Sequence, residues 1–281
     1  MHDGHALVLG GGGVAGIAWI TGLLAGLAET GDDVTGADVL IGTSAGAAVA
    51  AQLGSGLPLA ELLARQTDPE LQAAEIPAGV SLDKLAAEIG ASLAGVTTPE
   101  QYLRRIGAYA LAARTVPESA RRAVIESRLP GHEWPGRVIR LTAVDAHTGE
   151  LQVFDRESGA GLVDAVAASC AVPGVWPAVT IDGHRYVDGG VRSSDNADLA
   201  AGYRRITVIS PLGFDSPLPS PLPLREVTGQ LRDGGSEVIV CVPDEASRGA
   251  MGANPLDPST RAPAAQAGLA QGRAGLRAAA D

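Results

Sequence analysis

The chain has 281 residues, enough for one large domain or two small ones. Its 32 acidic and 21 basic side chains give a formal net charge of −11, which argues against a protein that binds nucleic acid by neutralising phosphates. Hydrophobic residues make up 46% of the chain, too many for a disordered one. Its two cysteines, Cys170 and Cys241, cannot form a disulfide framework at this length, so we expect reduced core thiols.

Two uncharged stretches, residues 6–28 and 39–60, are long enough to span a membrane. Both are interrupted by glycines, and residues 1–5 lack the positive segment of a signal peptide. Buried parallel strands that each run into a helix explain the two stretches better. We therefore expect a cytoplasmic protein.

The first elements in the chain are two strand-and-helix pairs. Residues 6–9 predict an apolar strand that ends at four glycines, and residues 15–30 predict the helix that follows. Residues 38–41 predict a second strand, followed by an alanine-rich helix through about Leu53. Strand, tight turn and helix, repeated within about fifty residues, indicate a parallel α/β sheet.

Residues 58–130 are expected to be mostly helical. Ser81 and Thr98 have the side chains of helix N-caps, and Pro117 predicts a break. This block is a candidate for a helical cap over the sheet.

The second half of the chain is expected to complete the sheet. Strands are predicted over residues 138–144, 151–154, 179–181, 185–187, 205–209 and 237–242. The first and second of these strands predict one hairpin, and the third and fourth predict another. Helices are predicted over residues 163–170 and from residue 259 to the end, with a Pro-rich loop over residues 211–223. We expect one α/β domain, in which residues 6–210 form the core and residues 211–281 a C-terminal extension.

The first of three glycine-rich turns is Gly11-Gly12-Gly13-Val14-Ala15-Gly16, which fits G-x-G-x-x-G between a strand and a helix. One interpretation is a nicotinamide dinucleotide (NAD(P)) site, with Asp32, Asp33 or Asp38 at the spacing of the ribose-binding acid. Another is an oxyanion hole, because bare backbone can present N–H groups to a developing negative charge. A third is a tight turn without chemistry.

The second turn, Gly42-Thr43-Ser44-Ala45-Gly46, is a G-x-S-x-G. A nucleophile elbow places serine at a strained strand-to-helix turn, where small residues are needed because backbone segments approach closely. The strand before this turn and the helix after it match that context. The alternative is a serine that only caps the helix.

The third turn, Asp188-Gly189-Gly190, follows a predicted hairpin strand. Aspartate before glycine is common in ordinary turns. The functional alternative is a carboxylate held beside the nucleophile as its base.

A nucleophilic serine needs a proton acceptor, usually histidine. The chain has five histidines: His2, His5, His132, His147 and His184. Asp155 or Asp164 followed by His184 fits the order of an α/β-hydrolase triad. However, His147 and His184 lie in predicted turns, where we expect exposed side chains.

In this order, the three turns resemble the patatin-like phospholipase family. The resemblance covers about residues 6–200, and residues 168–174 (Ala-Ser-Cys-Ala-Val-Pro-Gly) also look like bacterial members. It implies a three-layer α/β/α fold with a mainly parallel central sheet. It also implies a lipid acyl hydrolase acting on phospholipids, lysophospholipids or neutral acyl esters, without a cofactor or metal.

The resemblance further implies a Ser–Asp dyad without a catalytic histidine. Ser44 would be the nucleophile and Asp188 its general base. The oxyanion hole would consist of the amides of Gly11, Gly12 and Gly13. The remaining motif glycines are Gly16, Gly42, Gly46, Gly189 and Gly190.

One position departs from the family pattern: many relatives have Arg or Lys where this chain has Ala15. That departure raises the questions of how the glycine turn is held and whether an anionic headgroup is favoured. Acyl chains would contact residues 58–130 or 211–223. The charge of −11 disfavours tight docking on anionic membranes, so contact with a membrane would be transient and hydrophobic. Two alternatives stay open, an NAD(P)-binding protein and a catalytically silent patatin-fold binding module.

Overall fold

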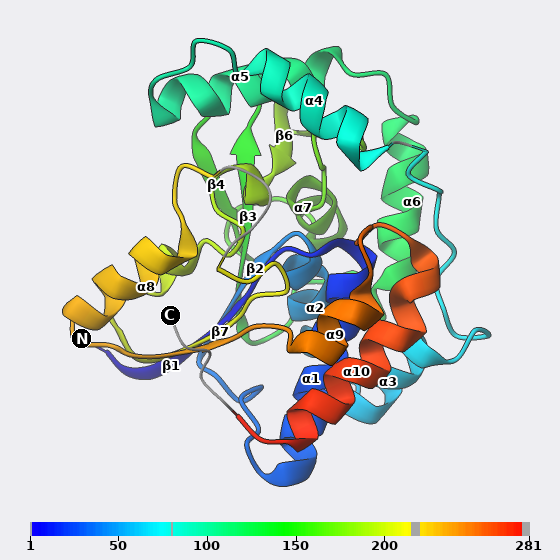
Figure 1. The fold of residues 1–281 in the computed structure, drawn as a ribbon, viewed down its shortest axis with the longest axis vertical. Coiled ribbons are helices and arrows are strands. Elements are labelled where there is room, and N and C mark those ends of the chain that lie inside the picture. Colours follow the sequence, from blue (N-terminus) through cyan, green and yellow to red (C-terminus); the bar gives the residue numbers. More distant parts are fainter. Residues whose placement is uncertain (1, 80, 215–219, 277–281) are drawn as a thin grey trace.

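A computed structural model describes residues 2–79, 81–214 and 220–276. Within them, an eight-stranded sheet lies between layers of helices (Figure 1). The strands are β1 (His2–Leu9), β2 (Val39–Thr43), β3 (Val138–Asp145), β4 (Leu151–Phe154), β5 (Val179–Ile181), β6 (His184–Asp188), β7 (Tyr203–Ile209) and β8 (Glu237–Cys241). Their order is β5-β6-β3-β2-β1-β7-β8, with β4 paired to β3. The predicted three-layer α/β/α fold is confirmed.

The centre of the sheet is parallel and one side of it is antiparallel. β1 pairs in parallel with β2 and β7, β2 with β3, and β7 with β8. β3 pairs antiparallel with β4 and β6, and β5 with β6, which confirms both predicted hairpins. Since the carboxyl ends of parallel strands meet at one edge, the turns after β1 and β2 lie next to each other there.

The helices are α1 (Gly13–Thr30), α2 (Ala45–Gly54), α3 (Leu59–Thr67), α4 (Leu82–Ser92), α5 (Pro99–Ala112), α6 (Glu118–Arg128), α7 (Leu162–Ser169), α8 (Leu224–Asp233), α9 (Glu245–Met251) and α10 (Arg261–Arg273). The block over residues 58–130 is helical as predicted. Ser81 and Thr98 cap α4 and α5 through their hydroxyls. Pro117 lies directly before α6. Part of the predicted Pro-rich loop, residues 215–219, lies outside the described residues.

Alternate residues of the central strands bury opposite faces of the sheet. In β1, Leu7 and Leu9 pack into a core that includes side chains of α1, α2, α7 and α10. Ala6 and Val8 pack into a second core with α8. Burial on both faces explains the continuous apolar runs of these strands.

Most of α1 lies in the first uncharged stretch, and the helix is apolar and long enough to cross a membrane, but 78% of it is buried inside the fold. α1 packs along α10 at very short range. A Cβ at Gly22 would lie 2.0 Å from the carbonyl oxygen of Ala265 in α10, so only glycine fits there. Gly26 likewise meets the backbone of α10, so these two glycines of the apolar stretch serve helix-to-helix packing.

Candidate active site

Ser44 lies at the junction of β2 and α2 in a strained backbone conformation, with φ 53° and ψ −114°. Its amide donates a hydrogen bond to Ser169 Oγ at 2.9 Å. Its carbonyl oxygen accepts one from Cys170 Sγ at 3.2 Å. Its own side chain makes no capping hydrogen bond to α2. The geometry thus matches the predicted elbow and not the capping alternative.

The elbow packs directly against the end of β1. A Cβ at Gly46 would lie 1.9 Å from the carbonyl oxygen of Leu9, and the Gly46 amide donates to Gly10 O at 3.0 Å. A side chain at residue 46 would push the elbow away from the glycine turn. The small residues of G-x-S-x-G are therefore required by close backbone approach.

Asp188 is the last residue of β6 and is 5% exposed. Its Oδ1 accepts a hydrogen bond from the Gly190 amide at 2.7 Å. Burial raises the pKa of Asp188 to about 6, and hydrogen bonds from the Ser44 side chain and the Gly190 amide partly oppose that rise. The structure thus brings together the serine and the aspartate of two motifs that are far apart in the sequence.

The glycine turn is held by main-chain contacts. The Gly11 amide donates to Ser194 O at 2.8 Å, and the amide of the buried Ala15 donates to Pro255 O at 3.0 Å. These bonds hold the turn without a charged side chain at residue 15. The amides of Gly12 and Gly13 have no acceptor among the described residues. Of the three predicted oxyanion donors, Gly11 is thus already engaged, while Gly12 and Gly13 are available.

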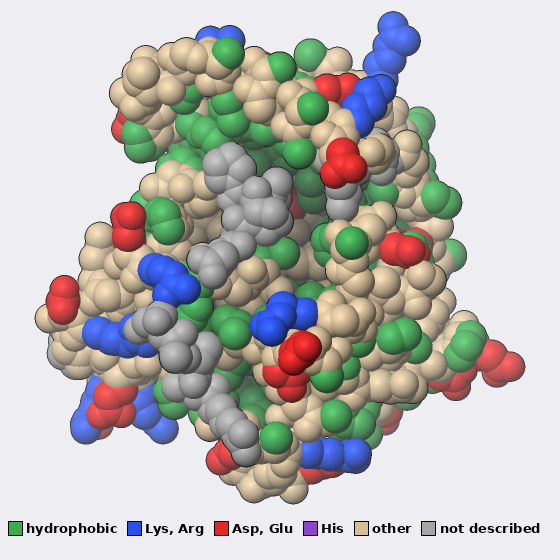
Figure 2. Space-filling view, in the orientation of Figure 1, with side chains coloured by type: hydrophobic (Ala, Val, Ile, Leu, Met, Phe, Trp, Pro, Cys, Tyr) green, Lys and Arg blue, Asp and Glu red, His purple; other side chains and the backbone are tan. Residues whose placement is uncertain are grey.

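A pocket opens beside Ser44. Its lining includes Gly13, Val14, Ile17, Ser44, Ala45, Glu75, Ile76, Arg121, Arg128, Cys170, Val172, Trp176 and Leu256. Several of these belong to an apolar cluster that extends to Leu85 and Ile89 of α4 and Tyr109 of α5. In the space-filling view, the molecule is hollowed below α4 and α5, with hydrophobic side chains around the hollow (Figure 2).

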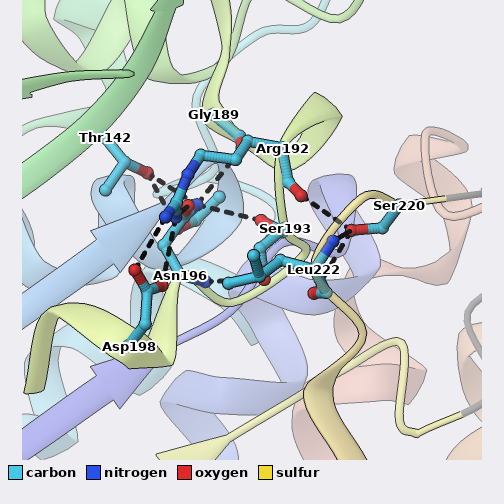
Figure 3. A network of polar contacts seen from close by, with 9 residues as sticks. Thr142, Gly189, Arg192, Ser193, Asn196, Asp198, Ser220 and Leu222 are labelled. Atoms are coloured by element: carbon cyan, nitrogen blue, oxygen red, sulfur yellow. Dashed lines mark hydrogen bonds and ion pairs between the residues drawn. The ribbon is translucent and has the colours of Figure 1, made fainter. Parts of the chain in front are cut away.

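One buried side chain, Asn196, joins the segments on which Ser44 and Asp188 lie. Figure 3 shows its contacts with Thr142 and Gly189. Its Nδ2 lies 3.1 Å from Thr43 Oγ1, which precedes Ser44, and 3.2 Å from Gly189 O, which follows Asp188. It also lies 3.3 Å from Thr142 Oγ1. Sequence analysis missed Asn196, because a lone asparagine in a loop carries no local pattern.

The residues of the triad alternative make other contacts. His184 Nδ1 lies 3.0 Å from Asp145 Oδ2, and 63% of the histidine side chain is exposed, as expected. Asp164 binds Arg122 at 2.6 Å. Asp155 accepts a backbone hydrogen bond from Glu157. In the part of the chain that the structure describes, no three His, Cys, Asp or Glu side chains are grouped to hold a metal ion. Cys170 and Cys241 are buried and unbonded to each other.

The profile of the patatin-like phospholipase family matches residues 7–201, well over half of the chain. The protein belongs to this family. The matched range contains all three glycine-rich turns, so the turn after β1 is part of a patatin-like phospholipase domain and not of a dinucleotide-binding one. β8 and α10 lie beyond the matched range and complete the sheet and the cover of α1.

Two solved structures resemble this patatin-like protein. VipD from Legionella pneumophila is 14% identical with a TM-score of 0.47, over 97% of this chain and 66% of the VipD chain. The type III effector protein ExoU is 16% identical with a TM-score of 0.39, over 97% of this chain and 53% of the other. The chain therefore spans less than two thirds of either. A comparison with curated proteins found no match.

Proposed function

We propose that this protein is a phospholipase A-type lipid acyl hydrolase that uses a Ser44–Asp188 dyad and an acyl-enzyme intermediate. Family membership supports lipid acyl hydrolysis, and the position of the Ser44 side chain beside the buried carboxyl group of Asp188 carries the proposal of the dyad. The pKa of Asp188, raised to about 6, makes its carboxylate a better base than an exposed aspartate while leaving it ionised at neutral pH.

In this mechanism Ser44 Oγ attacks the ester carbonyl while Asp188 accepts the hydroxyl proton. The amides of Gly12 and Gly13, at the N-terminus of α1, donate hydrogen bonds to the tetrahedral oxyanion. Collapse of the intermediate breaks the ester bond, and Asp188 returns the proton to the leaving alcohol. Water then attacks the acyl-enzyme, with Asp188 again as base, and releases the fatty acid and free Ser44.

The acyl chain of the substrate would occupy the apolar side of the pocket, along Ile76, Val172, Trp176 and Leu256. Apolar contact supplies binding free energy in proportion to the area buried, about 25 cal/mol per Å². The protein would act in the cytoplasm and reach membrane lipids by brief apolar contact, because its charge of −11 repels anionic surfaces.

The nucleophile is tested with a fluorophosphonate probe and a series of p-nitrophenyl esters of increasing chain length. We expect the probe to label wild type but not Ser44→Ala, with ester hydrolysis reduced at least about 10³-fold. Ser127→Ala is the matched control, because that hydroxyl bonds only the Val124 carbonyl on α6. Equal labelling of wild type and Ser44→Ala would refute the assignment. A wild type that neither reacts with the probe nor hydrolyses any ester would favour the catalytically silent alternative.

A further inference from the structure

Three buried arginines surround a single carboxylate beside the Ser44 pocket. Arg128 binds Glu75 through Nε at 2.9 Å and Nη2 at 2.5 Å. Arg261 Nη2 also binds Glu75, at 2.5 Å from Oε1, the oxygen that accepts from Arg128 Nε. Arg121 Nη1 is more distant, at 3.7 Å. All four side chains are only 5–6% exposed, and three guanidinium groups against one carboxylate leave the cluster with a net charge of +2.

Arg121 is the least satisfied member of this cluster. Its Nε and Nη1 are buried and have no hydrogen-bond partner among the described residues. Its guanidinium carbon lies 3.9 Å from the centroid of the Trp176 ring, a cation–π contact that holds the group in one orientation. Buried guanidinium donors are normally hydrogen-bonded, so two unused donors on a fixed group indicate a missing partner.

The position of Arg121 in the Ser44 pocket indicates the class of its missing hydrogen-bond partner. Arg121, Trp176 and Ser44 line the same pocket, as does Arg128. Burial and the nearby Arg128 lower the pKa of Arg121 to about 10, so it is still charged at neutral pH. A fixed, charged guanidinium with unused donors matches the planar oxygen pairs of a phosphate or carboxylate.

We infer that Arg121, supported by Arg128, forms a subsite for an anionic group of the substrate, a phosphate or a carboxylate, and makes the enzyme prefer anionic acyl esters. This inference rests on the proposed function. It means that Ala15 does not prevent selection for an anionic headgroup, since recognition comes from α6 instead of the glycine turn. The local charge of the cluster also contrasts with the overall charge of −11, which disfavours anions elsewhere.

The kinetic test compares ester pairs that differ only in charge. The phosphate pair is a lysophosphatidic acid and the monoacylglycerol with the same acyl chain. The carboxylate pair is mono-p-nitrophenyl glutarate and p-nitrophenyl pentanoate. We expect wild type to prefer the anionic member of at least one pair. The pair that shows this preference tells whether the subsite binds a phosphate or a carboxylate. Arg121→Gln should lower kcat/KM for that member about 10–100-fold, mainly through KM, and change the neutral member less than about threefold.

Two variants control this test. Arg122→Gln removes the neighbouring arginine of α6, which is 41% exposed and pairs with Asp164 and Glu126, and should leave both members of each pair unchanged. Arg121→Lys keeps the charge without the planar fork, so it should recover part of the preference, and it serves in place of Arg121→Gln if that variant does not fold. An equal loss for anionic and neutral esters, or a wild type without any anionic preference, would overturn the subsite.

A binding test separates the subsite from the catalytic proposal. Dodecyl phosphate should raise the Tm of Ser44→Ala more than dodecanol does, and the difference should vanish in Ser44→Ala/Arg121→Gln. If wild type hydrolyses no ester but this difference persists, the proposed function fails and the subsite stands. If esters are hydrolysed without an Arg121-dependent charge preference, the subsite fails and the proposed function stands.

Discussion

Asp188 and Asp195 lie seven positions apart, and both are buried near the same edge of the sheet. Burial raises the pKa of Asp188 to about 6 and that of Asp195 to about 7, and each has a serine hydroxyl as neighbour, Ser44 or Ser210. Asp195 Oδ1 would lie only 2.0 Å from a Cβ at Gly10, so it packs directly on the glycine turn. By burial and pKa alone, Asp195 is as strong a candidate base as Asp188.

The surroundings of the two carboxyl groups differ. Asp188 accepts a hydrogen bond from the Gly190 amide, and its serine lies at a strained elbow that lines a pocket. Neither oxygen of Asp195 has a hydrogen-bond partner in the described part of the chain, and Ser210 Oγ is likewise unbonded. A raised pKa therefore reports burial, while a catalytic role also requires a positioned partner and access for substrate.

The largest expected effect separates the two aspartates by activity. Asp188→Asn should lower kcat/KM for a p-nitrophenyl ester by about 10²-fold or more, because the base is lost while the fold is kept. Asp195→Asn, the matched control, should change kcat/KM by less than about threefold. Loss of activity in Asp195→Asn with an active Asp188→Asn would reverse the assignment.

The pH dependence of the rate sharpens the same distinction. Asp188 must be ionised to accept a proton, so kcat/KM should rise through a midpoint near pH 6 and be flat above about pH 7. At pH 5, one unit below the midpoint, we expect a rate about tenfold below the plateau. The profile should be the same in Asp195→Asn, and a midpoint that moves in this variant would assign the titration to Asp195.

A smaller effect is expected at Asn196, which we regard as a positioning residue. Asn196→Ala removes the hydrogen bonds that join Thr43 and Gly189, so we expect kcat to fall about 3–10-fold and the free energy of unfolding by about 1–3 kcal/mol. Asn196 has φ 49°, which alanine adopts poorly. Asn196→Gly tolerates this φ, so a similar loss in both variants, measured by kinetics and urea unfolding, would assign the effect to the side chain. Unchanged kcat in both would remove Asn196 from the site.

Asp195→Asn should have the smallest effect on activity, and it should raise the free energy of unfolding, whereas Asn196→Ala should lower it. Burial raises the pKa of Asp195 in the folded protein from the 3.8 of an ordinary aspartate to about 7. Its contribution to stability is therefore fully present below about pH 4 and is lost as the pH rises to about 7. Asp195→Asn avoids this loss and should be more stable than wild type by roughly 1–3 kcal/mol at pH 8, with a smaller difference at pH 4.

Urea unfolding at the two pH values measures this difference. Asp182→Asn is the control, since Asp182 lies in the exposed turn of a hairpin at φ 49°, a conformation that asparagine tolerates. A destabilised Asp195→Asn at pH 8 would show that the ionised carboxylate contributes favourably to the fold.

How much of the molecule the sequence predicts depends on whether a constraint is local. The turns around Ser44 and Asp188 can be predicted from the sequence because close backbone approach requires glycine at fixed positions, such as Gly46 against Leu9. The central strands can be predicted from their continuous apolar runs because both faces of these strands are buried. The elements of residues 6–209 accordingly lie within a few residues of their predicted bounds.

Other features arise only when distant segments meet. Arg121 and Glu75 belong to separate segments that share no motif, and their meeting depends on how residues 58–130 fold over the sheet. Two helices, α8 and α9, were not predicted. α8 has Leu224, Val227 and Leu231 at helical spacing, a signal that was present but short.

The close packing of α1 against α10 has a consequence for synthesis. The two helices are separated by about 230 residues of chain, so α1 leaves the ribosome roughly 12–50 s before its cover exists, at 5–20 residues per second. During that interval a largely apolar, glycine-rich helix is open to solvent and to other nascent chains. We therefore expect the yield of native protein to depend on chaperones, and removal of residues 261–276 to cause aggregation even though Ser44 and Asp188 are intact.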